Sequence, residues 1–137
     1  MKTYNISVCI FYDKDKVLLQ DRKNFNIIRF GEEYGFFGGG IKQGETPAQA
    51  LKREIKEELN IEIKNYVFFK KYVQKFKEFD AIVERHVFIA PMPNIKNLKV
   101  DEGKPFVTQF KESFNLKMMP GDIDILKEIY QSYLDNP

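Results

Sequence analysis

The sequence predicts a single α/β domain. Two amphipathic helical patterns and several stretches rich in β-branched and aromatic residues lie along a chain of 137 residues, and no repeat or shift in composition divides it. A chain of this length is long enough for one hydrophobic core and short for two. We therefore expect one domain spanning residues 1–137.

The composition argues against several functional classes. A hydrophobic content of 43%, with abundant Phe and Tyr, favours a folded globule over a disordered chain. The formal net charge of +2 gives no general attraction to a nucleic acid polymer or an acidic membrane. A single cysteine, Cys9, excludes an intramolecular disulfide and a cysteine-based zinc site. With no signal peptide and no bilayer-spanning apolar run, the sequence favours a cytoplasmic protein without a membrane partner.

The first elements expected are two strands and a glycine-rich loop. Residues 6–12 and 17–20 are β-branched and aromatic and flank a polar turn, which predicts a hairpin. Residues 21–34 are expected to form an irregular loop. Residues 35–40 contain four glycines, which suits a loop whose backbone approaches a ligand closely or adopts positive φ.

A helix is predicted over residues 47–59. Thr46 is the expected N-cap, Pro47 the first helical residue, and Gln49 the partner that completes a capping box. Apolar residues at three- and four-residue intervals predict its buried face: Ala48, Leu51, Ile55 and Leu59. Asn60 is the expected left-handed C-terminal cap.

Strands are expected to dominate the second half. The predicted strands are residues 61–69, 71–76, 80–90 and 106–110, with an exposed loop over 94–104. A C-terminal helix is predicted over residues 123–134. The side chains expected to point inward from it are Ile125, Leu126, Ile129, Tyr130 and Tyr133.

Three carboxylates share one face of the helix predicted over residues 47–59. Glu54, Glu57 and Glu58 are spaced i, i+3 and i+4, opposite the apolar stripe. Carboxylates about 4 Å apart repel by about 4 kcal/mol per pair at an effective dielectric of about 20, and a divalent cation relieves that repulsion. Oxygen ligands favour Mg²⁺ or Mn²⁺. The alternative is a solvated face with ion pairs along the helix, but the adjoining glycines and capping box favour the metal site.

The stretch from Gly39 to Ile61 resembles the Nudix box of the Nudix hydrolases. The matching positions are Gly39, Glu45, Arg53, Glu54, Ile55, Glu57, Glu58 and Ile61. Asn60 replaces the family's glycine, and asparagine tolerates the same left-handed conformation. Phe37 replaces the proline that many members have before the two glycines.

The resemblance implies an α/β/α sandwich in which helices flank a central mixed sheet. It also implies an enzyme, a MutT-like pyrophosphohydrolase that uses Mg²⁺ or Mn²⁺ to cleave a nucleoside diphosphate linked to another group. The implied metal ligands are Glu54, Glu57 and Glu58, with the Gly38 carbonyl as a further one. Arg53 would hold one carboxylate in place, and Glu45 would support it from the helix start. The general base is left open among Glu57, Glu58 and a distal acid, Glu102, with Glu84 as the competitor of Glu102.

Three further residues are candidates for contacting the substrate. Arg22 and Arg29 precede the glycines and are candidates for binding phosphates, with solvated arginines as the alternative. Asp122 lies where some purine-specific relatives carry a residue that reads the base, with an N-cap of the last helix as the alternative.

The substrate expected from the resemblance is a nucleoside triphosphate, either a dNTP or an oxidised purine dNTP. The alternatives are hydrolysis of a nucleotide sugar, ADP-ribose or a dinucleoside polyphosphate, and a non-catalytic domain that senses a nucleotide. An isomerase of isoprenyl diphosphates would need a cysteine near the site, and Cys9 is poorly placed for that role. The chain is expected to act as a monomer or a homodimer.

Overall fold

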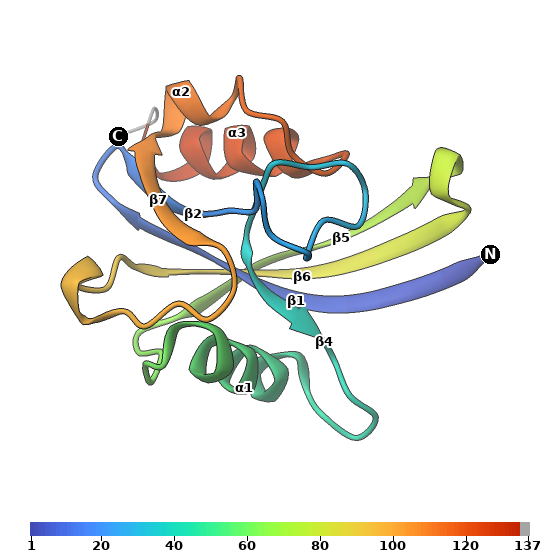
Figure 1. Cartoon of the computed structure of the whole chain (residues 1–137), viewed down its shortest axis with the longest axis horizontal. Helices are drawn as coiled ribbons and strands as arrows, with labels where there is room; N and C mark the ends of the chain where they lie inside the picture. The colour runs from blue at the N-terminus through green and yellow to red at the C-terminus, as the bar shows by residue number, and fades with distance from the viewer. Residues whose placement is uncertain (135–137) are drawn as a thin grey trace.

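The computed structural model describes residues 1–134. A mixed sheet of seven strands lies between helix α1 on one face and helices α2 and α3 on the other (Figure 1). The strands are β1 Lys2–Asp13, β2 Lys16–Asp21, β3 Tyr34–Gly35, β4 Phe37–Gly40, β5 Val67–Phe76, β6 Ala81–Pro91 and β7 Lys104–Gln109. The helices are α1 Pro47–Leu59, α2 Phe110–Ser113 and α3 Asp122–Tyr133, with short 3₁₀ turns η1 Lys77–Phe79 and η2 Ile95–Asn97.

Strand β1 is the centre of the sheet. Along one edge it pairs in parallel with β6, from Lys2 with Ala81 to Tyr12 with Pro91. Along its other edge it pairs with β4 over residues 6–9 and with β2 over residues 11–13, both antiparallel. The sheet therefore forks on that edge of β1, where β2 continues to β3 and β7.

Alternation along β1 divides the core into two layers. Val8 and Ile10 point into a cluster with α3, whereas Cys9 and Phe11 point into a cluster with α1. Successive side chains of a strand point to opposite faces, so one apolar strand supplies both layers. The α/β/α sandwich predicted from the sequence is confirmed.

Helix α1 has the predicted bounds and both predicted caps. The Thr46 hydroxyl accepts from the Gln49 amide at 3.1 Å, and the Gln49 side chain accepts from the Thr46 amide at 2.9 Å. Asn60 has φ 58° and ψ 36°, the left-handed conformation expected of it. The fully buried side chains of α1 are Ala50, Leu51, Ile55 and Leu59. Each of the three larger ones contributes about 1.5–3 kcal/mol by burial.

The glycine-rich segment is partly a strand, so the predicted loop over residues 35–40 is wrong. Phe37–Gly40 forms β4 and pairs with β1. A Cβ on Gly38, which has φ +141°, would lie 2.1 Å from the Ser7 carbonyl oxygen. The glycine is needed there because two backbones meet closely inside the sheet.

Three other predictions are corrected. Residues 61–66 are irregular rather than extended, and Asn65 has φ 57° there. The two strands predicted on either side of residue 70 form one strand, β5, with a bulge between Phe68 and Lys70. Tyr133, expected to point inward from α3, is 47% exposed.

In the part of the chain that the structure describes, residues 1–134, no helix combines the length and apolar character needed to cross a membrane.

Candidate active site

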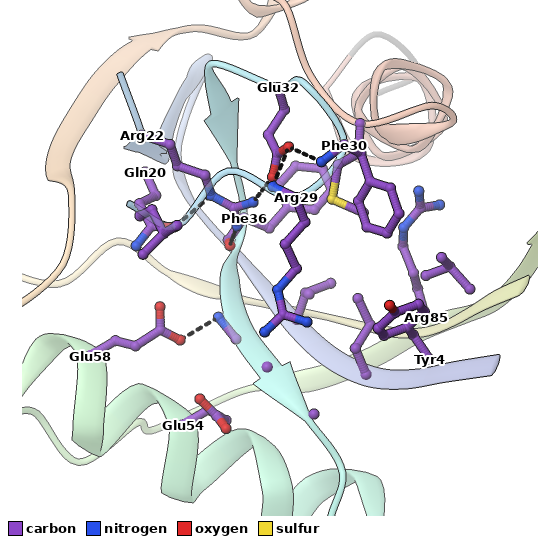
Figure 2. Close-up of a pocket in the computed structure, with 18 of the residues that line it drawn as sticks. Tyr4, Gln20, Arg22, Arg29, Phe30, Glu32, Phe36, Glu54, Glu58 and Arg85 are labelled. Carbon is purple, nitrogen blue, oxygen red and sulfur yellow. Dashed lines mark hydrogen bonds and ion pairs between the residues drawn. The ribbon is translucent and has the colours of Figure 1, made fainter. Parts of the chain in front are cut away.

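A cleft of about 860 Å³ lies between α1, strand β4, the loop over residues 22–33 and the start of α3 (Figure 2). Glu54, Glu57 and Glu58 of α1 line one side of it. Figure 2 shows Arg85 across the cleft from Glu54 and Glu58. The cleft therefore has an acidic side, formed by these three glutamates, and an opposite end where Arg85 lies.

Glu58 is the most shielded of the three α1 carboxylates. Its Oε1 accepts a hydrogen bond from the Gly38 amide at 2.9 Å. Burial raises the pKa of Glu58 to about 8, the Gly38 amide opposes that rise, and the negative charges of Glu54 and Glu102 add to it. Burial, more than the neighbouring carboxylates, therefore disfavours the charged form of Glu58.

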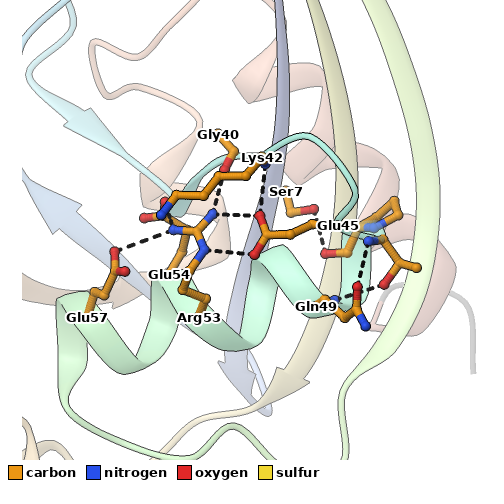
Figure 3. Close-up of polar contacts among 10 residues, drawn as sticks. Ser7, Gly40, Lys42, Glu45, Gln49, Arg53, Glu54 and Glu57 are labelled. Atoms are coloured by element: carbon orange, nitrogen blue, oxygen red, sulfur yellow. Dashed lines mark hydrogen bonds and ion pairs between the residues drawn. The ribbon is translucent and has the colours of Figure 1, made fainter.

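Arg53 ties α1 to the end of β4 (Figure 3). Its Nε and Nη2 donate to the two carboxylate oxygens of Glu45 at 2.8 and 2.9 Å, and Nη2 also donates to the Gly40 carbonyl at 2.8 Å. Its Nη1 donates to Glu54 at 2.7 Å and lies 3.5 Å from Glu57. The paired carboxylates raise the pKa of Arg53, and Arg53 holds the pKa of Glu45 at about 2. Such a fork fixes the orientation of a planar carboxylate.

The fit of this acidic side to a divalent cation can be judged from its donors. Across residues 1–134, no three His, Cys, Asp or Glu side chains converge as a ready ligand cluster, because Arg53 engages Glu54 and Glu57 while Gly38 engages Glu58. The donors themselves are all oxygen, as Mg²⁺ and Mn²⁺ prefer. A bound cation would also favour the charged form of Glu58, which burial disfavours. The residue types and their charge therefore fit a hard divalent ion.

Gly39 makes room for one of these carboxylates. A Cβ on Gly39 would lie 2.5 Å from the carboxyl carbon of Glu54. A side chain at this position would therefore displace Glu54 from the wall of the cleft.

The distal acids separate into one that lines the cleft and one that does not. Asp101 and Glu102, in the loop before β7, line the cleft, and Glu102 is close enough to raise the pKa of Glu58. Glu84 is absent from the lining residues and pairs with Lys71 of β5 at 3.0 Å. Of the two competing distal acids, Glu102 is the one that lines the cleft.

The two arginines predicted to contact phosphates differ in whether the protein already binds their guanidinium groups. Arg22 lines the cleft, but its guanidinium donates to the Gln20 side chain at 2.7 Å, to Glu32, and to the Phe36 carbonyl at 3.0 Å. Arg29 is exposed and extends from its loop toward the α1 side (Figure 2). Within residues 1–134, no hydrogen bond or ion pair holds the Arg29 guanidinium. Arg29 is thus the one of the two that is available to a phosphate.

Glu32 fixes the loop that carries Arg29, and it was not predicted from the sequence. The residue is 1% exposed, and its carboxylate accepts from the amides of Arg29 at 3.2 Å and Phe30 at 2.8 Å and pairs with Arg22. The Phe30 ring packs edge-on against Phe76. In the sequence Glu32 is one charge in a charged loop, and nothing local signals its burial.

A buried ion pair lies at the end of the cleft across from α1. Arg85 and Asp122 are 1% and 2% exposed, and Arg85 Nε lies 3.4 Å from Asp122 Oδ1. Arg85 also donates to Gln74 at 3.3 Å and to the Pro120 carbonyl. Burial raises the pKa of Asp122 to about 7 although Arg85 opposes the rise, and burial lowers the pKa of Arg85.

The position of the Arg85–Asp122 pair corrects the alternative role of Asp122 as an N-cap and adds Arg85 to the candidate site residues. The N-cap of α3 is Gly121, with φ 90° and no side-chain cap, so Asp122 is not the cap. Arg85 was not predicted. Its signal was its place in the alternating buried row of β6, between Val83 and Val87, where an apolar residue is expected.

Comparisons with known proteins match this chain to a family model, to curated relatives and to solved structures. A family model described as the NUDIX domain matches residues 1–123. An RNA pyrophosphohydrolase from Nitratiruptor sp. is 31% identical over 90 residues, which cover 58% of this chain and 57% of that protein. An 8-oxo-dGTP diphosphatase from Buchnera aphidicola is 32% identical over 89 residues, which cover 62% and 66%. The chain thus spans less than two thirds of either relative.

The fold is shared with a solved structure over most of both chains. The crystal structure of the MutT protein from Bacillus halodurans superposes with a TM-score of 0.75 and 26% identity, covering 96% of this chain and 84% of that one. Similarity at this level extends the match beyond the central stretch to the sheet and both helical layers.

Proposed function

Because the chain belongs to the Nudix family, we propose that it is a divalent-metal-dependent pyrophosphohydrolase acting on a nucleoside triphosphate, either a dNTP or an oxidised purine dNTP. One observation carries the proposal. The cleft places acidic residues on its α1 side and the buried Arg85–Asp122 pair at its opposite end. The acidic side suits a metal-bound polyphosphate, and Asp122 at the opposite end offers a carboxyl group to a planar base.

Glu54, Glu57 and Glu58 would hold Mg²⁺ or Mn²⁺, with the Gly38 carbonyl as a further oxygen ligand. When bound, the cation would neutralise charge on the phosphates and lower the pKa of a bound water. The all-oxygen donors support this assignment, as does the burial of Glu58, which a bound cation would offset.

The chain's own groups would orient the reactants. Arg53 keeps Glu54 on the wall of the cleft and is itself held by Glu45. Arg29 would contact a phosphate oxygen. Water would form a new bond to phosphorus while the bond between phosphorus and the bridging oxygen breaks, and a carboxylate would accept the proton of the water. Glu57, Glu58 and Glu102 are the candidates for that base.

Asp122 and Arg85 would select the base of the nucleotide. A buried carboxyl group discriminates strongly among bases, because a base that cannot pair with it leaves a buried polar group unpaired. Arg85 would contribute mainly by holding Asp122, since its Nη atoms already donate to Gln74 and Pro120. The name of the Buchnera relative, an 8-oxo-dGTP diphosphatase, is consistent with a purine substrate.

Replacing Asp122 with asparagine is expected to change how stability depends on pH. Burial raises the folded-state pKa of Asp122 to about 7 from its ordinary value of 3.8, so at pH values between these two the folded protein keeps a proton that the unfolded chain has lost. Wild-type stability should therefore fall as pH rises through that window, and Asp122→Asn should lack this contribution. Urea unfolding of both proteins at about pH 5 and about pH 8 measures it. The stability of wild type relative to the variant should be lower at the higher pH.

Asp124→Asn is the matched control, because Asp124 lies in the same helical turn and is exposed. Its pH profile should follow wild type. If the stability of wild type and that of Asp122→Asn changed with pH in parallel, the result would contradict the raised pKa of Asp122 in the folded protein. In hydrolysis assays, Asp122→Asn should also change the ratio of kcat/KM between purine and pyrimidine nucleotides, whereas Asp124→Asn should not.

The RNA pyrophosphohydrolase similarity favours a second candidate, the 5′-triphosphate end of an RNA. The same metal site would serve, and only the group beyond the polyphosphate would differ.

A substrate panel tests the proposal. Wild-type protein with Mg²⁺ would be given canonical and oxidised dNTPs, nucleotide sugars, ADP-ribose, dinucleoside polyphosphates and a 5′-triphosphorylated RNA. Release of pyrophosphate from a dNTP, with ¹⁸O from labelled water appearing in one product, is expected. Preference for the RNA would favour the second candidate. If the protein hydrolysed no member of the panel, the result would contradict catalysis and favour a domain that only binds nucleotides.

A further inference from the structure

Asn60 ends α1 in a conformation that glycine adopts more easily. Its φ of 58° and ψ of 36° are left-handed, and the Nudix box has glycine at this position. Asparagine tolerates this region better than most residues, yet it gives up the freedom that glycine has there. A specific contact of the side chain would account for the presence of asparagine.

The Asn60 side chain makes such a contact with the loop between η2 and β7, residues 98–103. Asn60 Nδ2 donates to the Lys99 carbonyl at 2.7 Å, and the Lys99 amide donates to the Leu59 carbonyl at 3.3 Å. The two hydrogen bonds run in opposite directions between the end of α1 and one residue of the loop. With glycine at position 60, only the bond from the Lys99 amide to the Leu59 carbonyl would remain.

The other end of this loop is fixed to β2. The buried Gln20 side chain donates from Nε2 to the Glu102 carbonyl at 3.0 Å. Gly103 has φ +73°, and a Cβ there would lie 2.7 Å from the Asp21 carbonyl oxygen. Residues 99–103 are therefore a short span held at both ends, by α1 on one side and by β2 on the other.

This span brings acidic side chains to the carboxylates of α1. Asp101 and Glu102 line the cleft beside Glu58. Between Lys99 and Glu102 there are only two residues, so the position of Lys99 restricts where the Glu102 side chain can reach. We propose that Asn60 is a positioning residue whose side-chain amide holds the loop so that Glu102 stays in the cleft. The catalytic consequence rests on the proposed function, in which Glu102 is a candidate base.

Two substitutions separate the hydrogen bond from the backbone conformation. Asn60→Gly keeps the left-handed cap and removes the donor. Asn60→Asp keeps the size and much of the tolerance for that conformation, but its carboxylate cannot donate to the Lys99 carbonyl. The matched control is Asn65→Gly, because Asn65 is also exposed and left-handed, with φ 57°, and no side-chain hydrogen bond of Asn65 occurs within residues 1–134.

Amide hydrogen exchange measures the hold directly. In Asn60→Gly and Asn60→Asp, exchange in a peptide covering residues 98–104 should be faster by about tenfold, while that of α1 peptides stays as in wild type. Asn65→Gly should leave the 98–104 peptide unchanged. Wild-type exchange in the loop of both Asn60 variants would overturn the proposal.

A double-mutant cycle measures the consequence for Glu102. Asn60→Gly should lower kcat by about fivefold to tenfold with little change in KM, and should lower it no further in a Glu102→Gln background. An equal loss in both backgrounds would show that Asn60 acts elsewhere and would overturn the positioning role. If wild type hydrolyses no member of the panel, the proposed function fails, and the exchange comparison still decides whether Asn60 holds the loop.

Discussion

Glu58→Gln is expected to lower kcat by roughly a thousandfold while the protein stays folded. Glutamine has nearly the shape of glutamate, and its carbonyl oxygen can still accept from the Gly38 amide. The negative charge is lost, and with it a ligand for the cation and a candidate base. Removing one group that stabilises charge at a reacting centre costs about 10²–10³ in kcat. Steady-state hydrolysis of the best panel substrate measures the effect.

Stability separates this loss from unfolding. Burial disfavours the charged form of Glu58, as its raised pKa shows, so the neutral glutamine should leave the melting temperature unchanged or higher. Glu62→Gln is the control, because it makes the same chemical change at an exposed residue beyond α1. It should retain wild-type kcat. Near-normal turnover by Glu58→Gln would contradict the assignment of the acidic side as the metal site.

Removing divalent cations is expected to abolish hydrolysis. Glu54, Glu57 and Glu58 line the side of the cleft that a polyphosphate would meet, and their carboxylates would repel it unless a cation lay between them. Activity should disappear in excess chelator and return when Mg²⁺ or Mn²⁺ exceeds the chelator. Assays at constant ionic strength would exclude simple screening of charge. Full hydrolysis in excess chelator would refute the requirement.

Binding of the cation can also be followed without a substrate. A ligand that binds only the folded state stabilises it by about 2.7 kcal/mol at a hundred times its Kd. The melting temperature of wild type should therefore rise with Mg²⁺ or Mn²⁺ concentration. The rise should be much smaller in Glu58→Gln and should persist in Glu62→Gln. An identical rise in both variants would place the bound ion elsewhere.

The helix at the centre of the site was predictable because its signals are local. Thr46, Pro47 and Gln49 lie within one turn of its start, and Asn60 marks its end, so the predicted and observed bounds agree. Hydrogen bonds between residues three or four apart can be inferred from spacing alone. The strands were predicted less accurately at their ends, because their partners lie far away in the sequence.

The glycine segment shows why some of the site could not be predicted. Four glycines in six positions indicate close approach, but the sequence does not say to what. In the structure Gly38 meets the backbone of Ser7, and Gly39 faces Glu54. The burial of Glu32 and Arg85 could not be predicted either, because it depends on partners from other elements.

The three carboxylates illustrate a different limit. Their helical spacing predicted one shared face, and all three do line the cleft. Spacing did not predict that Arg53 would engage two of them, because that geometry is set by Glu45 and the Gly40 carbonyl. Their roles as ligands, and those of Arg29 and Asp122 in binding substrate, remain predictions.

The parallel pairing of β1 with β6 has a consequence for how this protein folds during its synthesis. Strand β1 is synthesised well before its parallel partner β6, which ends at Pro91. At typical rates of synthesis the apolar residues of β1 wait several seconds for that partner. During this interval the nascent chain exposes one edge of its central strand, a state open to aggregation or capture by a chaperone. Refolding in vitro should be slow for the chain's length for the same reason, since its central pairing joins distant segments.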